Sequence, residues 1–282
     1  HLLIEGLNES NNPGFIIFTS GTTGNPKAVL HDLNKFQKSL RDAKKPFRTL
    51  AFLLFDHIAG LDTLFYTFKS GGSLVLTDDR TPNAICKLAD KSKVEVLPVS
   101  PSFINLLYVS KDYKKHDLSS VSIITLGSEP ISTGLIERTH QIFPNARIIQ
   151  KYGTSEFGSP RTKSRQDDPT WIYMESEFFK TKIIDNVLWV NSQTTMLGYL
   201  NQDEQPVKDG WYCTEDRVEV DGEWMRILGR ESDIINVGGE KVFPTEVEAT
   251  ILELEWIEDC LVYGEKNPLL GNIVCVEVKP IS

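Results

Sequence analysis

The segment Thr19 to Lys27 combines residue types that bind phosphate, and it directly follows the apolar run Phe15 to Thr19. Gly21 and Gly24 let the backbone approach a polyphosphate, and Lys27 supplies positive charge. Hydroxyl groups that can donate to phosphate oxygens come from Thr19, Ser20, Thr22 and Thr23. The segment is not a Walker loop, which needs lysine directly after its second glycine, because Lys27 trails Gly24 by three positions. The pattern predicts a buried strand that leads into a phosphate-gripping loop.

Two carboxylates further along the chain are candidates for metal and sugar binding. Glu156 closes the block Tyr152-Gly153-Thr154-Ser155-Glu156, which follows an expected strand, and Asp216 closes Gly210-Trp211-Tyr212-Cys213-Thr214-Glu215-Asp216. Mg²⁺ prefers hard oxygen ligands and commonly takes one carboxylate together with substrate phosphates. A lone Glu after a strand is most often a solvated surface residue. The prediction that Glu156 binds a metal therefore depends on the sequence blocks around it.

These blocks, in this order, resemble those of the AMP-dependent synthetase and ligase superfamily, the adenylate-forming enzymes, and look closest to acyl-CoA synthetases. The Thr19 to Lys27 segment resembles the signature loop of that family, and further blocks agree with it along nearly the whole chain. They are Phe55 to Gly60, Gly127 to Pro130, Tyr152 to Glu156, Gly210 to Asp216, Gly229 to Asp233 and Gly238 to Pro244. An unrelated nucleotide-binding α/β domain would require this order to be coincidental.

The resemblance assigns roles at the nucleotide. It implies that Tyr152 lies against the adenine, Ser155 bonds the α-phosphate, Glu156 holds Mg²⁺ and Asp216 binds the ribose hydroxyls. Catalytic roles fall to Thr19, Lys27, Ser155 and Glu156. Nucleotide contacts are expected from Ser20, Gly21, Thr22, Thr23, Gly24, Gly127, Ser128, Glu129, Tyr152, Gly153, Asp216 and Arg230. The chain departs from the family at Ser155, where threonine is usual, and at Glu215, where glycine is usual.

The acid pocket and the hinge are implied by the same resemblance. His57 is the candidate gate of the acid site, with Phe103 in the pocket wall, although a lone histidine is often a structural residue. Asp56 could instead mimic the aspartate with which amino-acid-activating domains bind the substrate amine. Ser232 takes the hinge position, where the family more often has Asp or Lys. A small residue suits a position that must absorb a large φ/ψ change.

The elements that must position these residues alternate between strand and helix from about Thr49 to Tyr152. This alternation predicts an α/β fold with a mainly parallel sheet layered with helices, and ligands gather at the carboxyl ends of such strands. Short strands and turns follow from about Trp171, and a partial small α+β domain closes the chain. We expect a nucleotide-binding core at 1–170, a β-rich subdomain at 171–231 and the small C-terminal domain at 232–282. A helix is expected from about His31.

The composition of the chain argues against nucleic acid and membranes as binding partners. The chain has 282 residues, of which 40% are hydrophobic and 24% charged, as in ordinary globular proteins. A formal charge of −9 leaves no broad basic field for nucleic acid or an anionic membrane. The longest apolar stretch is too short to insert into a membrane. The four cysteines form no C-x-x-C pair, which indicates a reducing, cytoplasmic location.

The resemblance implies an enzyme that uses ATP and Mg²⁺ to join a small carboxylic acid to AMP and then passes the acyl group to CoA. An adenylation enzyme that loads the phosphopantetheine of an acyl carrier protein shares every block. A ligase-like protein that binds ATP or acyl-AMP without turnover is a third possibility. The chain begins at His1 and stops before the family's C-terminal lysine, so it is either a shortened form or a naturally short enzyme. The sequence does not identify the acid.

Overall fold

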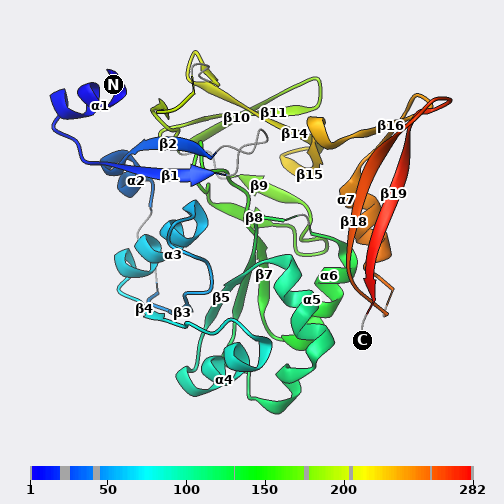
Figure 1. Cartoon of the computed structure of the whole chain (residues 1–282). Coiled ribbons are helices and arrows are strands. Elements are labelled where there is room, and N and C mark those ends of the chain that lie inside the picture. Colours follow the sequence, from blue (N-terminus) through cyan, green and yellow to red (C-terminus); the bar gives the residue numbers. More distant parts are fainter. Residues whose placement is uncertain are drawn as a thin grey trace.

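The computed structural model describes residues 2–19, 26–40, 45–129, 131–174, 178–202, 206–254 and 256–280. Figure 1 shows three parts that follow one another along the chain: a parallel sheet covered by helices, antiparallel strands above it, and a hairpin-rich sheet that stands to one side. The fold is therefore α/β with a β-rich region and a small C-terminal α+β part, as the strand and helix alternation predicts. No helix in the described ranges is long and apolar enough to cross a membrane.

The central sheet has five parallel strands in the order β4-β3-β5-β6-β7. Its strands are β3 (Arg48–Leu50), β4 (Ser73–Val75), β5 (Val96–Val99), β6 (Ile123–Leu126) and β7 (Arg147–Gln150). The crossover helices are α3 (Ile58–Lys69), α4 (Pro82–Ser92), α5 (Pro101–Ser110) and α6 (Thr133–Ile142), with a short 3₁₀ turn η1 (Asp112–Lys115). Because the strands are parallel, their carboxyl ends meet at one edge, and the loops that follow β6 and β7 lie side by side there.

Local sequence explains where these helices start. Ser100 and Ser132 cap α5 and α6, their hydroxyls accepting from the backbone N–H three residues ahead at 3.3 Å and 3.1 Å. Proline stands in the first turn of α4 and α5, where its missing N–H costs nothing. Alternate residues of the strands, including Leu97 and Ile124, are buried against α4, α5 and α6. The opposite face of the sheet is covered in part by α3.

Two antiparallel sheets lie over the carboxyl edge. The smaller one has the order β1-β2-β12 and comprises β1 (Gly14–Thr19), β2 (Lys27–Asp32) and β12 (Gly198–Tyr199), with α1 (Leu2–Glu9) and α2 (Leu33–Ser39) beside it. The larger one has seven strands in the order β10-β11-β14-β15-β9-β8, with β13 beside β14. Its strands are β8 (Thr162–Ser164), β9 (Ile172–Met174), β10 (Phe179–Ile184), β11 (Val187–Ser192), β13 (Val207–Lys208), β14 (Trp211–Asp221) and β15 (Trp224–Arg230).

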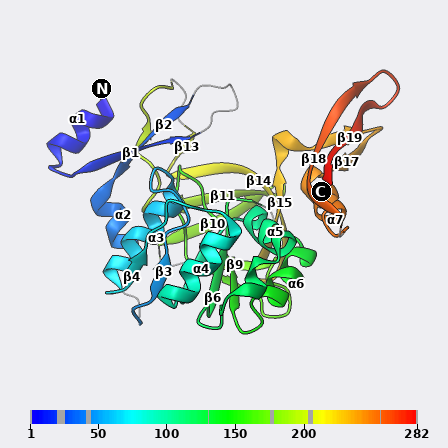
Figure 2. The same cartoon turned by 60° about the horizontal axis from the view of Figure 1, so that its bottom comes forward.

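The C-terminal part is a four-stranded antiparallel sheet with one helix. It contains η2 (Glu231–Asp233), β16 (Ile235–Val237), β17 (Glu240–Val242), α7 (Pro244–Ile251), β18 (Ile257–Asn267) and β19 (Gly271–Pro280). Figure 2 shows this sheet standing apart from the rest, with its helix turned toward the side of α5 and α6. The expected domain limits stay a prediction. The larger antiparallel sheet includes β8, and β12 pairs with β2 near the amino terminus.

One expectation about the amino-terminal segment is wrong, and the start of its helix is shifted by two residues. The run Phe15 to Thr19 forms β1, but it is not a buried strand, since Phe18 is 65% and Ile16 46% exposed and only Ile17 lies in a core. Successive side chains of β1 point to opposite faces of its sheet, and the face that carries Ile16 and Phe18 is exposed. His31 lies in β2, and the helix begins at Leu33, because Asp32 is its cap.

Candidate functional site

Tyr152 meets Asp216 and Arg230, which belong to one β-hairpin far from it in the sequence, above the carboxyl edge of the parallel sheet. Tyr152 lies just beyond β7, and Asp216 and Arg230 are paired residues of β14 and β15. The Tyr152 hydroxyl donates to Asp216 Oδ2 at 2.5 Å, and Arg230 Nε lies 3.8 Å from Asp216 Oδ1. This contact ties the larger antiparallel sheet to the parallel sheet at the point where ligands bind in open α/β folds.

Burial shifts the acid–base behaviour of this group. Burial raises the pKa of Asp216, while the Tyr152 hydroxyl and the charge of Arg230 oppose the rise. Burial and the neighbouring Asp216 charge raise the pKa of Tyr152 well above its usual value, so its hydroxyl stays a donor at neutral pH. Shifted groups of this kind gather at binding and catalytic sites. Asp216 thus has one oxygen held by Tyr152 and a second directed toward Arg230.

A second polar group surrounds Glu156. The Tyr199 hydroxyl donates to Glu156 Oε1 at 2.8 Å, and Lys27 Nζ lies 5.2 Å from the centre of the Tyr199 ring. Tyr199 reaches this position because β12 pairs with β2, where it stands opposite Val29. Lys27 therefore lies near Glu156 across a tyrosine ring. A carboxylate, a lysine and a phenol in this arrangement suit a phosphate chain with its counter-ion.

The structure describes the two ends of the expected phosphate loop, at Thr19 and at Lys27. Thr19 ends β1 and stands opposite Lys27 at the start of β2. The expected nucleotide contacts from Ser20, Gly21, Thr22, Thr23 and Gly24 concern residues outside the described ranges. Asn201 fixes the returning strand, since its Oδ1 accepts from Ala28 N and its Nδ2 donates to Pro26 O, both at 2.8 Å. The loop thus starts and returns between paired strands close to Glu156.

The turn from Gly153 to Gly158 sets the position of Glu156. Thr154 and Gly158 exchange backbone hydrogen bonds of 3.1 Å and 2.9 Å, and Thr154 Oγ1 accepts from Glu156 N at 3.2 Å. A Cβ added to Gly153 would lie 2.4 Å from Gly158 O, so the close approach of the two backbones requires glycine there.

Ser155 is buried at the centre of this turn, and its carbonyl accepts from His31 Nε2 at 2.6 Å. Burial lowers the pKa of His31, which keeps its imidazole neutral. His31 also stacks on Phe15 with ring centroids 5.0 Å apart. The turn is therefore anchored to β2 by a histidine that the sequence patterns did not single out.

The loop after β6 lies against the residue before Tyr152. A Cβ on Gly127 would meet Lys151 Cβ and Lys151 O at 3.2 Å, and Ser128 has a positive φ of 72°. Glu129 does not point to the Tyr152 group, because its Oε2 accepts from Ser102 N at 2.8 Å and from the Ser102 hydroxyl. A carboxylate at the start of α5 interacts favourably with the positive end of the helix dipole. The nucleotide roles of these loop residues stay predictions.

The three remaining candidates lie apart from these groups. His57 is exposed and caps α3, with its Nδ1 accepting from Ala59 N at 3.4 Å. Phe103 is 4% exposed within the core of the parallel sheet and packs on Phe52 with ring centroids 4.5 Å apart. Ser232 lies exposed in η2, and its hydroxyl donates to Asp233 Oδ1 at 2.9 Å. Their roles as gate, pocket wall and hinge stay predictions.

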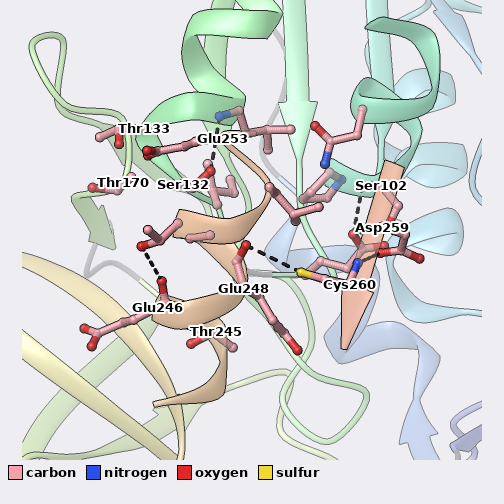
Figure 3. Close-up of a pocket in the computed structure, with 18 of the residues that line it drawn as sticks. Ser102, Ser132, Thr133, Thr170, Thr245, Glu246, Glu248, Glu253, Asp259 and Cys260 are labelled. Atoms are coloured by element: carbon pink, nitrogen blue, oxygen red, sulfur yellow. Dashed lines mark hydrogen bonds between the residues drawn. The ribbon is translucent and has the colours of Figure 1, made fainter. Parts of the chain in front are cut away.

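A cavity of about 730 Å³ opens between the helices of the parallel sheet and the C-terminal part. Figure 3 shows Glu246 and Glu248 of α7 among the residues that line this space, together with Ser102 at the start of α5 and Ser132 at the start of α6. Its lining includes none of Tyr152, Glu156 or Arg230. This cavity separates two parts of the chain that the expected hinge would move, and it lies away from the polar groups described above.

A second cavity of about 460 Å³ runs along the sheet face that α3 covers. Its floor comes from alternate residues of β5, β6 and β7, including Val96, Ile123 and Ile149. Lys151 and Asp62 lie at its inner end, and they form an ion pair with Nζ 3.7 Å from Oδ2. Burial raises the pKa of Asp62, opposed by the charge of Lys151. Neither residue was among the sequence candidates, and neither His57 nor Phe103 lines this cavity.

Comparison with known proteins finds a matching family model and relatives that are named as ligases. A family model described as AMP-binding enzyme matches residues 5–174. The chain is 29% identical over 272 residues to the 4-coumarate--CoA ligase-like 9 of Arabidopsis thaliana, covering 86% of this chain and 48% of that protein. It is 26% identical over 271 residues to the putative long chain fatty acid-CoA ligase VraA of Staphylococcus epidermidis, covering 91% of this chain and 58% of that protein.

Solved structures share the fold. The crystal structure of the anthranilate CoA ligase AuaEII in complex with anthranoyl-AMP superimposes with a TM-score of 0.81 at 23% identity, covering 94% of this chain and 56% of that one. The chain spans about half the length of the curated relatives it matches.

Proposed function

The chain belongs to the family of AMP-binding enzymes, and from that premise we propose that it joins a small carboxylic acid to AMP with ATP and then transfers the acyl group to the thiol of CoA. The observation that carries this proposal is the meeting of Tyr152, Asp216 and Arg230 beside Glu156. The names of the relatives support the reaction class, since both curated relatives above are named as CoA ligases. Family membership alone does not choose the acid or the acceptor.

The proposal gives the nucleotide three contacts in the described residues. Tyr152 offers a ring against the adenine, Asp216 Oδ1 accepts from the ribose hydroxyls, and Arg230 neutralises charge between ribose and phosphate. Ser155, Thr19 and the loop that Lys27 closes take the phosphates. These contacts would fix the nucleotide across the carboxyl edge of the parallel sheet, the position favoured by doubly wound folds.

The Glu156 carboxylate fits a magnesium ion shared with substrate phosphates. Its Oε1 accepts from Tyr199, and none of the described residues donates a hydrogen bond to its Oε2, which leaves a hard oxygen for the ion. Among the described residues no cluster of three or more His, Cys, Asp or Glu side chains could hold a metal, so phosphate oxygens would supply other ligands. When bound, Mg²⁺ neutralises the charge that develops on the phosphates.

The chemical step needs positioning more than covalent help from the protein. An oxygen of the acid attacks the α-phosphorus of ATP, the bond to the β-phosphate oxygen breaks, and pyrophosphate leaves with that electron pair. Lys27 and the hydroxyls of the loop stabilise the charge on the phosphates, and the walls of the site hold the two reactants in line. The thiolate then attacks the acyl carbon of the acyl-adenylate, the new C–S bond forms, and AMP leaves with the electron pair of the broken C–O bond.

The segment around Ser232 is the proposed hinge between these half-reactions. Glu231 accepts from Arg217, and its Oε1 lies 3.4 Å from Lys241 Nζ. These ion pairs span the residues before and after Ser232, so they hold one orientation of the C-terminal part. Exposed pairs of this kind contribute little energy each, which suits a segment that must rearrange between adenylation and thiol transfer.

Two alternatives share the nucleotide site. A carrier protein could present phosphopantetheine in place of CoA, since the described residues that form the nucleotide groups do not distinguish the acceptors. A protein that binds acyl-AMP without turnover would keep Tyr152 and Asp216 and lack the acid-dependent step.

Trapping of the acyl-adenylate with hydroxylamine tests the proposal. The chain is incubated with Mg·ATP, hydroxylamine and aryl, fatty or amino acids in separate reactions, and hydroxamate is measured. Product with at least one acid, reduced strongly in Glu156→Gln, is the expected result. AMP binding without hydroxamate from any acid would favour the non-catalytic alternative.

A further inference from the structure

The two backbone carbonyls on either side of Glu156 accept hydrogen bonds from buried side chains outside the turn. Ser155 O accepts from His31 Nε2 at 2.6 Å, and Phe157 O accepts from Thr194 Oγ1 at 2.7 Å. Only 1% of His31 and 3% of Thr194 is exposed, so bulk water does not compete for these bonds. A buried carbonyl that loses its donor is costly. The backbone around Glu156 is therefore fixed by two side chains that are distant from it in the sequence.

Glu156 itself is held by the segment that contains Thr194. Its backbone carbonyl accepts from Met196 N at 2.6 Å, and its Oε1 accepts from the Tyr199 hydroxyl at 2.8 Å. Ser192 orients Thr194 in turn, since the two hydroxyls lie 2.7 Å apart and Ser192 Oγ accepts from Thr194 N at 3.0 Å. The main chain and one carboxylate oxygen of Glu156 are thus bonded, and Oε2 is the oxygen to which no group in the described ranges donates.

Strand β2 supports both sides of this arrangement. His31 lies on β2, and β12 pairs with β2 so that Tyr199 stands opposite Val29. Because alternate residues of a strand point to the same face, Lys27 and His31 share one face of β2. One strand therefore sets the spacing between the lysine that is expected to contact phosphate and the groups that hold the Glu156 turn.

We propose that His31 and Thr194 are positioning residues for the magnesium complex of ATP, and that they act by holding the Glu156 carboxylate at a fixed spacing from Lys27. This inference rests on the proposed function and assigns the support of the same site. The phosphates of the complex must reach Lys27 and the ion at Glu156 together, so a shift of the turn against β2 weakens the complex more than it weakens ATP alone. Groups that orient a metal-binding side chain commonly contribute about 10- to 100-fold to metal affinity.

A role in folding alone makes a different prediction. Loss of either bond leaves a buried carbonyl without its donor, which lowers the melting temperature whatever the turn does in catalysis. It does not change the ratio of the ATP affinity measured with Mg²⁺ to the ATP affinity measured without it. This ratio therefore separates positioning of Glu156 from packing of the turn.

Paired substitutions at Thr194 and His31 test the proposal. Thr194→Val keeps the shape of the side chain and removes its donor, whereas Thr194→Ser keeps the hydroxyl. His31→Leu removes the donor to Ser155 O, whereas His31→Gln keeps an amide N–H of similar reach. ATP binding is measured by calorimetry with Mg²⁺ and with EDTA, without any acid, so the measurement does not depend on turnover.

We expect the ratio of the two ATP affinities to fall about tenfold or more in Thr194→Val and His31→Leu. In Thr194→Ser and His31→Gln the ratio should stay within about threefold of that of the parent chain. Thr139→Val is the matched control, because Thr139 is fully buried in α6 and its Oγ1 donates to Leu135 O at 2.7 Å. This control should lower the melting temperature and leave the ratio unchanged.

The outcomes separate the inference from the proposed function. An unchanged ratio in folded Thr194→Val or His31→Leu, or an equal fall in Thr194→Ser or Thr139→Val, would overturn the inference. If His31→Leu does not fold, the Thr194 pair decides. An ATP affinity that does not depend on Mg²⁺ in the parent chain would overturn the inference as well, even if hydroxamate forms. The expected ratios without hydroxamate from any acid would support the positioning roles and count against turnover.

Discussion

Substituting Asp216 by asparagine tests the nucleotide site through the oxygen that the structure leaves for a ligand. Asp216 Oδ2 accepts from the Tyr152 hydroxyl at 2.5 Å, and Oδ1 lies 3.8 Å from Arg230 Nε. We therefore propose Asp216 Oδ1 as the acceptor for a ribose hydroxyl. Asparagine keeps the size of the side chain but removes its charge, and one amide position becomes a donor that faces either Tyr152 or Arg230.

The size of the effect follows from the loss of one charged acceptor. A hydrogen bond to a charged group contributes about 1.5–3 kcal/mol. With about 1.4 kcal/mol for each factor of ten, Asp216→Asn should weaken AMP binding about 10- to 150-fold. Calorimetric titration of AMP without acid or Mg²⁺ measures this loss directly, and circular dichroism checks that the variant is folded.

Asp221→Asn is the matched control, because Asp221 lies in the same strand. It pairs with Arg165 at 2.7 Å, and 64% of its side chain is exposed. It removes the same charge at a site where ion pairs contribute little. AMP affinity should change less than about twofold. If Asp216→Asn also stays within twofold, or if Asp221→Asn loses as much, the assignment of Asp216 to the nucleotide is refuted.

Three further predictions concern the same site. Tyr199→Phe removes the hydroxyl that donates to Glu156 at 2.8 Å. The apparent Mg²⁺ affinity in hydroxamate assays should therefore fall about tenfold or more, while AMP binding without Mg²⁺ stays constant. An Mg²⁺ dependence equal to that of the parent chain would contradict this prediction. Gly153→Ala would place a Cβ 2.4 Å from Gly158 O. Overpacking of this kind costs about 1–3 kcal/mol, so Tm should fall by roughly 2–12 °C. An unchanged melting curve would show that the turn accommodates the methyl group. Burial raises the pKa of Asp216 above 3.8, so AMP affinity should fall as pH falls through that raised pKa. The fall should be steeper than in Asp216→Asn, where only the AMP phosphate titrates in the same way. Parallel profiles of AMP affinity against pH in the parent chain and the variant would argue against a ligating carboxylate.

Protonation of Asp216 affects the free energy of unfolding in the opposite direction from its effect on AMP binding. Because the folded-state pKa of Asp216 lies above its ordinary value of 3.8, the folded chain holds this proton more tightly than the unfolded chain. The stability that protonated Asp216 contributes is present below pH 3.8 and is lost as pH rises through the raised pKa. A low pH therefore weakens nucleotide binding by Asp216 and also lowers the free-energy cost of burying its side chain.

The alternation of strands and helices was readable from the sequence because it depends on local periodicity. The alternation expected from about Thr49 to Tyr152 agrees with the observed order β3-α3-β4-α4-β5-α5-β6-α6-β7. Capping serines and first-turn prolines mark such limits within a few residues of chain. The exposure of Phe18 could not be read in this way, since burial depends on which elements cover β1.

The candidate site was only partly readable for the same reason. The blocks that end in Glu156 and Asp216 are local patterns, whereas the contact of Tyr199 with Glu156 depends on the pairing of β12 with β2 across the fold. The Lys151 and Asp62 pair likewise joins α3 to the end of β7, and no spacing in the sequence indicates it. Long-range pairing is what single-sequence patterns do not specify.

Exchange of labelled pyrophosphate into ATP tests the central claim most directly, because it reports adenylate formation without any thiol acceptor. The chain is incubated with Mg·ATP, labelled pyrophosphate and each acid of the panel, with Glu156→Gln as the matched variant. The account predicts exchange that depends on an added acid and nearly disappears in the variant. Tight AMP binding with no acid-dependent exchange for any acid would contradict the claim that the chain activates carboxylic acids.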